Sequence, residues 1–147
     1  MVPLIALFAS FLLFLVMGRA GIGPFHDVGF ALRCSLAVMF ALTASAHWGK
    51  RRPDLIRMVP PAFPNRGLLV TVTGILELLG AIGLLLPLTA RIAAICLAVM
   101  LIALFPANIH AARERLTIGG KPVPSLPVRG AIQLVFLAAL FAAWWLK

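Results

Sequence analysis

Long apolar stretches alternate along the chain with short connectors that hold most of the charged residues, prolines and turn glycines. Each stretch approaches the roughly 20 residues that a helix needs to cross a bilayer. The pattern predicts an all-α fold, a polytopic transmembrane helical bundle in one membrane domain covering residues 1–147. The expected membrane-spanning helices are residues 2–18, 28–46, 67–87, 91–108 and 128–146.

The first apolar stretch has two interpretations. Residues 2–18 can form a retained membrane helix or the core of a cleaved signal peptide, because Gly18-Arg19-Ala20 loosely resembles a small-residue cleavage site. A signal peptide also has a basic segment before its apolar core, and this chain has none there. We therefore expect the first helix to be retained.

The third stretch contains one ionisable residue, Glu77. It lies ten positions after Gly67, or roughly 15 Å along a helix, which is near the middle of a membrane. A carboxyl group at that depth is a functional candidate by default. Helical spacing places small residues around the same face, and these form the expected packing around the site: Gly74, Gly80 and Gly83.

Other candidate residues lie at the ends of the second and fourth stretches. His47 follows the second stretch, where it is either a site residue or an ordinary interfacial histidine. Pro106 frees a backbone carbonyl, and Asn108 and His110 add polar side chains beside it. This group predicts either the wall of a hydrated cavity or a kinked helix end with an asparagine cap.

The connector of residues 49–66 is basic and rich in proline. Between its prolines, residues 54–59 form a short amphipathic segment that we expect on the membrane surface. Two interpretations stay open for the connector: a basic loop that fixes topology, and a lid over a polar cavity.

Composition agrees with a membrane protein and excludes several functions. The chain is 63% hydrophobic and 12% charged, with a mean hydropathy of +1.09. Its net charge of +9 lies in the connectors, so we expect contact with membrane lipids and no nucleic-acid binding. Cys34 and Cys96 are far apart in sequence, and the absence of a Cys/His cluster predicts neither a metal site nor an intrinsic cofactor.

Charge in the connectors also predicts the orientation. The connectors after the second and fourth helices share one side of the membrane and carry most of the positive charge. Basic connectors stay in the cytoplasm, so we expect a cytoplasmic N-terminus and an external C-terminus. The basic residues of this side are Lys50, Arg51, Arg52, Arg57, Arg66, Arg113, Arg115 and Lys121.

Several sparse motifs occur in an order that resembles the DoxX family of small bacterial membrane proteins. They are Thr-x-Ser-x-His-Trp at 43–48, Met-Val-Pro-Pro at 58–61, Gly-Ile-Leu-Glu-Leu at 74–78 and Phe-Pro-Ala-Asn-Ile at 105–109. The resemblance implies a four-helix core over residues 28–146, with the first helix as an addition. It also implies a bacterial plasma membrane location, a membrane redox partner and a quinone as the possible ligand.

Two functions follow for the Glu77 site. A carboxyl in a dry bundle favours its protonated form, which can donate a hydrogen bond to a quinone carbonyl or pass on a proton. The chain would then be a quinone-interacting or redox-associated subunit. Alternatively, Glu77 bonds to a neighbouring helix and fixes packing, in a non-enzymatic bundle that binds a lipid or small hydrophobic molecule or holds a partner. The sequence leaves enzymatic activity and oligomeric state open.

Overall fold

Five helical segments of the structure are long and apolar enough to cross a membrane. The structure is a computed structural model and describes residues 1–146. Helices suit these sequences because a helix meets all of its backbone hydrogen bonds within itself, as a hydrocarbon environment demands. The predicted all-α fold and its five helices are confirmed. The segments are α1 (Val2–Arg19), α2 (Val28–Ser45), α4 (Arg66–Leu85), α5 with α6 (Ala90–Ala103, Phe105–Arg113) and α7 (Leu126–Trp145).

The fourth segment differs from its predicted bounds. It breaks at Leu104 and then continues to Arg113, five residues beyond the predicted end. Pro106 explains the break, because proline has no N–H to donate to the preceding turn and its ring clashes with the carbonyl there. Pro106 instead occupies the first turn of α6, where a missing N–H costs nothing. A kinked helix is therefore observed, with Asn108 inside α6 and not at its cap.

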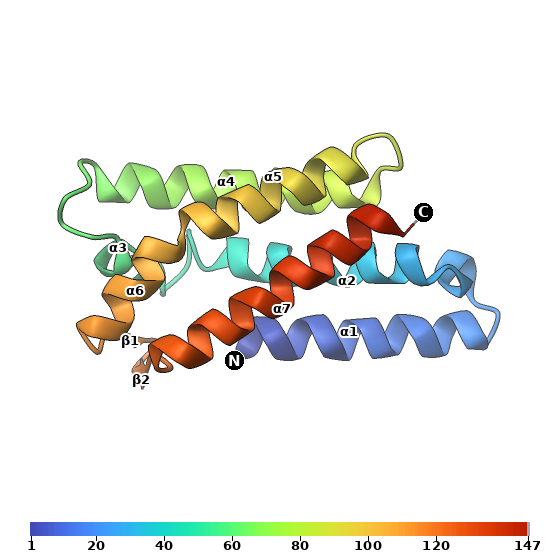
Figure 1. Cartoon of the computed structure of the whole chain (residues 1–147), viewed down its shortest axis with the longest axis horizontal. Helices are drawn as coiled ribbons and strands as arrows, with labels where there is room; N and C mark the ends of the chain where they lie inside the picture. The colour runs from blue at the N-terminus through green and yellow to red at the C-terminus, as the bar shows by residue number, and fades with distance from the viewer. Residues whose placement is uncertain (147) are drawn as a thin grey trace.

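Helix α2 lies at the centre of the bundle, between α4 with α5 on one side and α1 on the other (Figure 1). In its membrane-length window 56% of the residues are buried, against 6% for α1. Helix α1 is therefore the least buried of the five segments, although its Leu7 belongs to the core. The largest fully buried core side chains come from α2, α4, α5 and α7: Leu36, Met39, Phe40, Leu84, Leu97 and Leu140.

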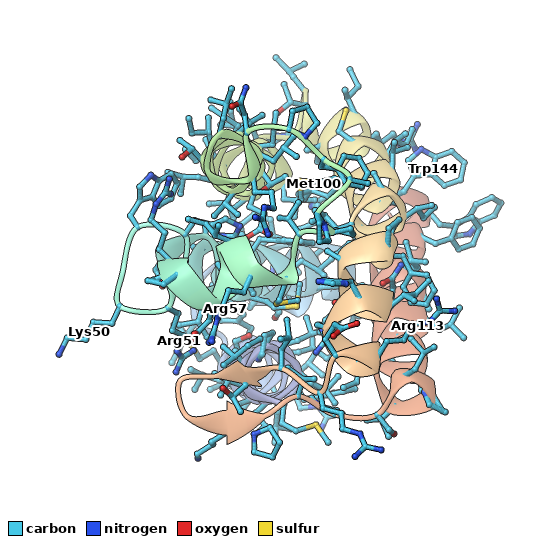
Figure 2. The ribbon with its side chains drawn as sticks, turned by 90° about the vertical axis from the view of Figure 1, so that its left-hand side faces the viewer. Lys50, Arg51, Arg57, Met100, Arg113 and Trp144 are labelled. Atoms are coloured by element: carbon cyan, nitrogen blue, oxygen red, sulfur yellow. The ribbon has the colours of Figure 1, made fainter. Side chains whose placement is uncertain are left out.

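Short elements cover one end of the bundle. Helix α3 (Arg52–Met58) forms where the sequence predicts an amphipathic segment, and a two-residue hairpin joins β1 (Thr117–Ile118) to β2 (Lys121–Pro122). The hairpin turns at Gly119 and Gly120, both of which have a positive φ. Figure 2 shows α3, α6 and the hairpin together at this end, near several basic side chains. A 3-10 turn, η1 (Gly23–His26), joins α1 to α2 at the opposite end.

Glycines allow α4 and α5 to approach closely. A Cβ atom on Gly80 would lie 2.5 Å from Leu97, and one on Gly83 would lie 2.8 Å from Ala93. The connector between the helices is only four residues long, and the helices are antiparallel neighbours. Gly80 and Gly83 therefore serve the contact with α5 and do not pack around the Glu77 site.

Candidate functional site

Glu77 is buried, with only 6% of its surface exposed. It belongs to a stripe of α4 residues spaced three or four apart, which is the face that packs on α2. The Glu77 carboxyl therefore points into the protein and away from the membrane lipid. The buried members of this stripe are Val70, Gly74, Glu77, Ala81 and Leu84.

His47 is the nearest polar partner of Glu77. Its Nδ1 atom lies 3.9 Å from the Glu77 Oε2 atom, and both side chains are about nine-tenths buried. The same Nδ1 atom is 3.2 Å from the Thr43 carbonyl oxygen, one turn earlier in α2. The Thr43 hydroxyl donates to the Phe40 carbonyl at 3.0 Å and neighbours the Glu77 carboxyl. The structure thus brings together two residues that lie 30 positions apart.

Gly74 makes the approach of His47 possible. A Cβ atom on Gly74 would lie 2.7 Å from both Cβ and Cγ of His47, closer than real side chains come. The imidazole therefore lies directly on the α4 backbone. Gly74 is eight residues into α4, or about 12 Å from the start of that helix. Helix α2 ends at that depth, so His47 is deep enough to reach Glu77, although its position at a helix end suggests a shallow residue.

Arg52 lies beside the site, between the end of α2 and the start of α4. Its guanidinium donates to the His47 carbonyl at 2.8 Å, to the Gly67 carbonyl at 3.1 Å and to the Thr71 hydroxyl at 2.9 Å. These bonds cap the end of α2 and join it to the first turns of α4. Sequence reasoning counted Arg52 only as one basic residue of a connector. The signal in the sequence that sets Arg52 apart from the other basic residues of the connector is its position directly before Pro53, at the start of α3.

One oxygen of the site has no hydrogen-bond partner. Oε2 of Glu77 is buried from solvent and accepts no hydrogen bond among the residues that the structure describes. Its separation of 3.9 Å from His47 exceeds the range of a hydrogen bond. A buried polar atom without a partner is costly. The Glu77 carboxyl therefore has an unused position for one further hydrogen bond.

The remaining candidates form a second polar cluster. Asn108 donates to the Gln133 side chain at 3.2 Å and accepts a hydrogen bond from Arg129. Gln133 donates in turn to the Leu101 carbonyl at 3.1 Å, in the last turn of α5 before the break. These bonds join α5, α6 and α7, and none of them involves Glu77 or His47. His110 lies half-buried on α6, outside this hydrogen-bonded chain.

The second cluster agrees partly with the sequence analysis. The expected polar group beside Pro106 exists, but Asn108 bonds to Gln133 and Arg129 of α7. Arg129 was not singled out by the sequence, since it lies at the edge of a basic connector. The spacing of four residues between Arg129 and Gln133 was the signal that both share a face of α7.

One acidic residue joins the short elements that cover the α3 end of the bundle. The Asp54 carboxylate accepts a hydrogen bond from the Gly119 N–H at 2.8 Å and pairs with Arg57 within α3. The Gly119 N–H and then the Arg57 guanidinium hold the pKa of Asp54 below its ordinary value near 3.8. This contact ties α3 to the hairpin 65 residues further along the chain.

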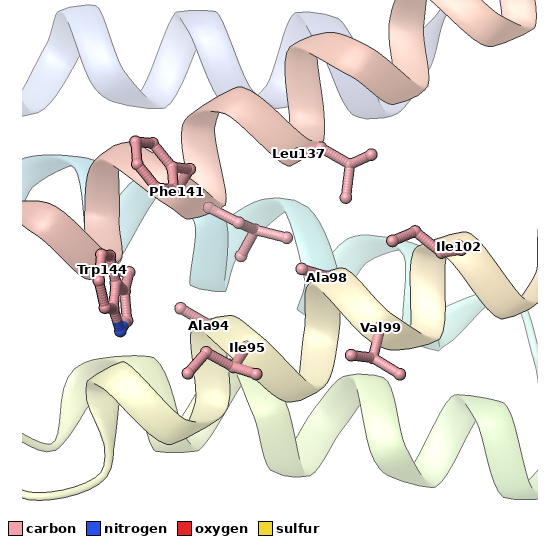
Figure 3. A pocket seen from close by; sticks show the side chains of 9 residues that line it. Ala94, Ile95, Ala98, Val99, Ile102, Leu137, Phe141 and Trp144 are labelled. Carbon is pink, nitrogen blue, oxygen red and sulfur yellow. The ribbon is translucent and has the colours of Figure 1, made fainter.

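An apolar groove of about 300 Å³ lies between α5 and α7 (Figure 3). It is open toward the surroundings of the bundle and has almost no polar lining. The lining residues are Ala94, Ile95, Ala98, Val99, Ile102, Leu137, Leu140, Phe141 and Trp144. Among residues 1–146 no group of three or more His, Cys, Asp or Glu side chains is arranged to hold a metal ion.

Fold and site together define a helical bundle of five membrane-length segments with a buried carboxyl–imidazole pair. The family described as Domain of unknown function (DUF8561) matches residues 36–146, well over half of the chain. The chain therefore belongs to this family. The match begins within α2 and leaves α1 outside, in agreement with the low burial of that helix. No curated protein and no solved structure matches the chain.

Proposed function

We propose that the protein is a redox-associated subunit of the bacterial plasma membrane, in which Glu77 and His47 exchange protons with a quinone. The single observation behind this proposal is the buried Oε2 atom of Glu77, which has no hydrogen-bond partner and lies 3.9 Å from His47. A carboxyl group in that position is costly for packing alone, and intramembrane carboxyl groups commonly mark proton or ligand sites. The DoxX-like order of motifs adds the association with redox systems.

Other polar residues lie on the α3 side of this carboxyl. The Arg52 guanidinium bonds to the backbone carbonyl of His47 and to the Thr71 hydroxyl, and the His47 imidazole lies 3.9 Å from Glu77. Histidine is the side chain best suited to relay protons near neutral pH. A proton that enters from the basic face can therefore reach Glu77 through His47.

The chemistry assigned to Glu77 is proton transfer and hydrogen bonding. Its protonated carboxyl donates a hydrogen bond to a quinone carbonyl and then transfers its proton. His47 afterwards supplies a new proton to the Glu77 carboxylate. Reduction of a quinone to a quinol consumes two protons and two electrons. The protein supplies the protons in this scheme, and a partner oxidoreductase of the membrane supplies the electrons.

A second function is supported by a different observation. The groove between α5 and α7 is apolar and lies on the outside of the bundle. A non-enzymatic protein that binds a lipid or small hydrophobic molecule would use this groove, and Glu77 would then hold α2 against α4. The two functions place the ligand at different sites and are separable by experiment.

The test replaces Glu77 by leucine, which keeps the approximate size of the side chain and removes its hydrogen-bond donor. We expect Glu77→Leu to co-purify with about tenfold less quinone than the native protein, because leaving the quinone carbonyl without its donor costs about 1–3 kcal/mol. The measurement is mass spectrometry of the organic extract from protein purified in detergent. Glu114→Leu is the matched control, since Glu114 is exposed and outside the site.

Two outcomes would contradict the quinone proposal. Equal quinone in Glu77→Leu and native protein would show that Glu77 does not bind the quinone. Phospholipid alone in all three preparations would favour the lipid-binding or scaffold function. Thermal unfolding of each variant establishes that the comparison is made on folded protein.

A further inference from the structure

Arg129 has more hydrogen-bonding capacity than its neighbours use. A guanidinium has five N–H donors, and the Arg129 side chain makes one hydrogen bond, to Asn108. Its Nε atom is buried without a partner among the described residues. The ion pairs within 4.0 Å in residues 1–146 are His47–Glu77 and Arg57–Asp54. Arg129 therefore has no acidic partner within the described chain.

One hydrogen bond joins Arg129 to a chain of polar groups that begins at Asn108. Asn108 accepts from Arg129 and donates to Gln133, which is anchored to the Leu101 carbonyl. This chain of bonds spans α6, α7 and the end of α5. A guanidinium that already makes one hydrogen bond loses less conformational freedom when it binds a further acceptor, and its planar donors suit a phosphate group.

A single face of α7 joins this cation to the apolar groove. Arg129, Gln133, Leu137, Leu140 and Trp144 follow one another at intervals of three or four residues. Leu137 is about 12 Å from Arg129 along the helix, and Trp144 about 22 Å. The last three of these residues line the groove, together with the facing residues of α5.

This face of α7 therefore has a cation in the first turn of the helix and the apolar groove further along it. Free phosphate would match the cation but not the groove, and a neutral hydrophobic molecule would match the groove but leave the guanidinium unused. We propose that the seam between α5 and α7 binds an anionic phospholipid. The phosphate accepts hydrogen bonds from Arg129, and one acyl chain lies in the groove. This site shares no residue with Glu77 and His47, so it stands or fails independently of the quinone proposal.

The experiment measures lipid binding to the full-length protein in detergent by native mass spectrometry. Dioleoylphosphatidylglycerol and dioleoylphosphatidylcholine are titrated separately, because they share acyl chains and differ in net charge. We expect the native protein to bind the anionic lipid at least about fivefold more tightly. Equal affinity for the two lipids would overturn the role of the Arg129 guanidinium, without the need for any variant.

Variants then test each end of the site. Arg129→Gln is expected to weaken phosphatidylglycerol binding about tenfold, the effect of one lost charge-assisted contact. Arg113→Gln removes the same charge from an exposed position at the same end of the bundle and should leave the affinity unchanged. An equal loss in both variants would show diffuse attraction to the basic face and would overturn the proposal.

Ala98→Phe tests the groove without touching the polar cluster. Ala98 lines the groove, so the added ring should fill it and weaken binding of both lipids. Unchanged affinity for phosphatidylglycerol in this variant would overturn the placement of the acyl chain. Size-exclusion profiles and melting temperatures of the variants show whether each is folded.

Discussion

Gly74 decides whether the two polar residues of the candidate site can meet. Its missing side chain leaves the space that the His47 ring occupies, at distances that no Cβ atom could tolerate. The sequence places Gly74 beside Glu77 by helical spacing. The sequence gives no indication that the same glycine receives a histidine from another helix.

We expect Gly74→Ala to lower the free energy of unfolding by about 1–3 kcal/mol, the usual cost of an extra methyl group in a packed interior. The measurement is thermal or denaturant unfolding in detergent. Gly130→Ala is the control, because a Cβ atom at that helical position meets open space. Alanine is the better helix former, so this control should gain up to about 1 kcal/mol. An equal gain in Gly74→Ala would contradict the packing of His47 on α4.

At the scale of elements, the tie between α3 and the hairpin depends on one carboxylate. Asp54 accepts the Gly119 N–H and pairs with Arg57, and both interactions favour the charged form. A carboxyl whose pKa is lowered on folding contributes stability above its unfolded value. That contribution is lost as the pH falls through the lower, folded value.

We therefore expect the attachment of the hairpin to be intact above pH 3.8, the ordinary value for Asp54, and to weaken below it. The Gly119 amide resonance should titrate with a midpoint below 3.8 in an NMR experiment on the detergent-solubilised protein. Asp54→Ala should abolish this titration, and Glu114→Gln should leave it unchanged. A midpoint at or above 3.8 would show that Asp54 gains nothing from Gly119 and Arg57.

For the whole molecule, the number of helices and the basic connectors predict the orientation. Five crossings place the ends of the chain on opposite sides of a membrane. The structure gathers α3, α6 and the hairpin, with many of the basic residues, at one end of the bundle (Figure 2). The turn between α4 and α5 lies at the other end (Figure 1).

Labelling of single cysteines tests this orientation. In a chain without Cys34 and Cys96, we expect Leu88→Cys to react with a membrane-impermeant maleimide in intact cells, since Leu88 is 94% exposed. Lys121→Cys should react only after the membrane is opened, because the positive-inside rule places the hairpin in the cytoplasm. The reverse pattern would invert the topology and the direction of the proposed proton path.

The sequence alone determined the class of fold and most helix bounds. Its apolar stretches are long enough to cross a membrane, and its prolines and glycines separate them. Helices α1, α2, α4 and α7 begin and end within two residues of their predicted bounds. This is possible because length and hydropathy are properties of each segment taken separately. The break at Leu104 shows the limit, since α6 continues beyond the proline and bonds to α7, which is distant in the sequence.

Only the tertiary structure decided which polar residues share a site. Glu77 and His47 lie close together because the end of α2 packs beside Gly74. Asn108 instead forms hydrogen bonds with Gln133 and Arg129 of α7. Helical periodicity fixes the face on which a residue lies. It does not fix the neighbouring helix or the relative depth of two helix ends, which depend on packing between segments far apart in the chain. That is the physical reason why Arg52 and Arg129 emerged as site residues only from the folded protein.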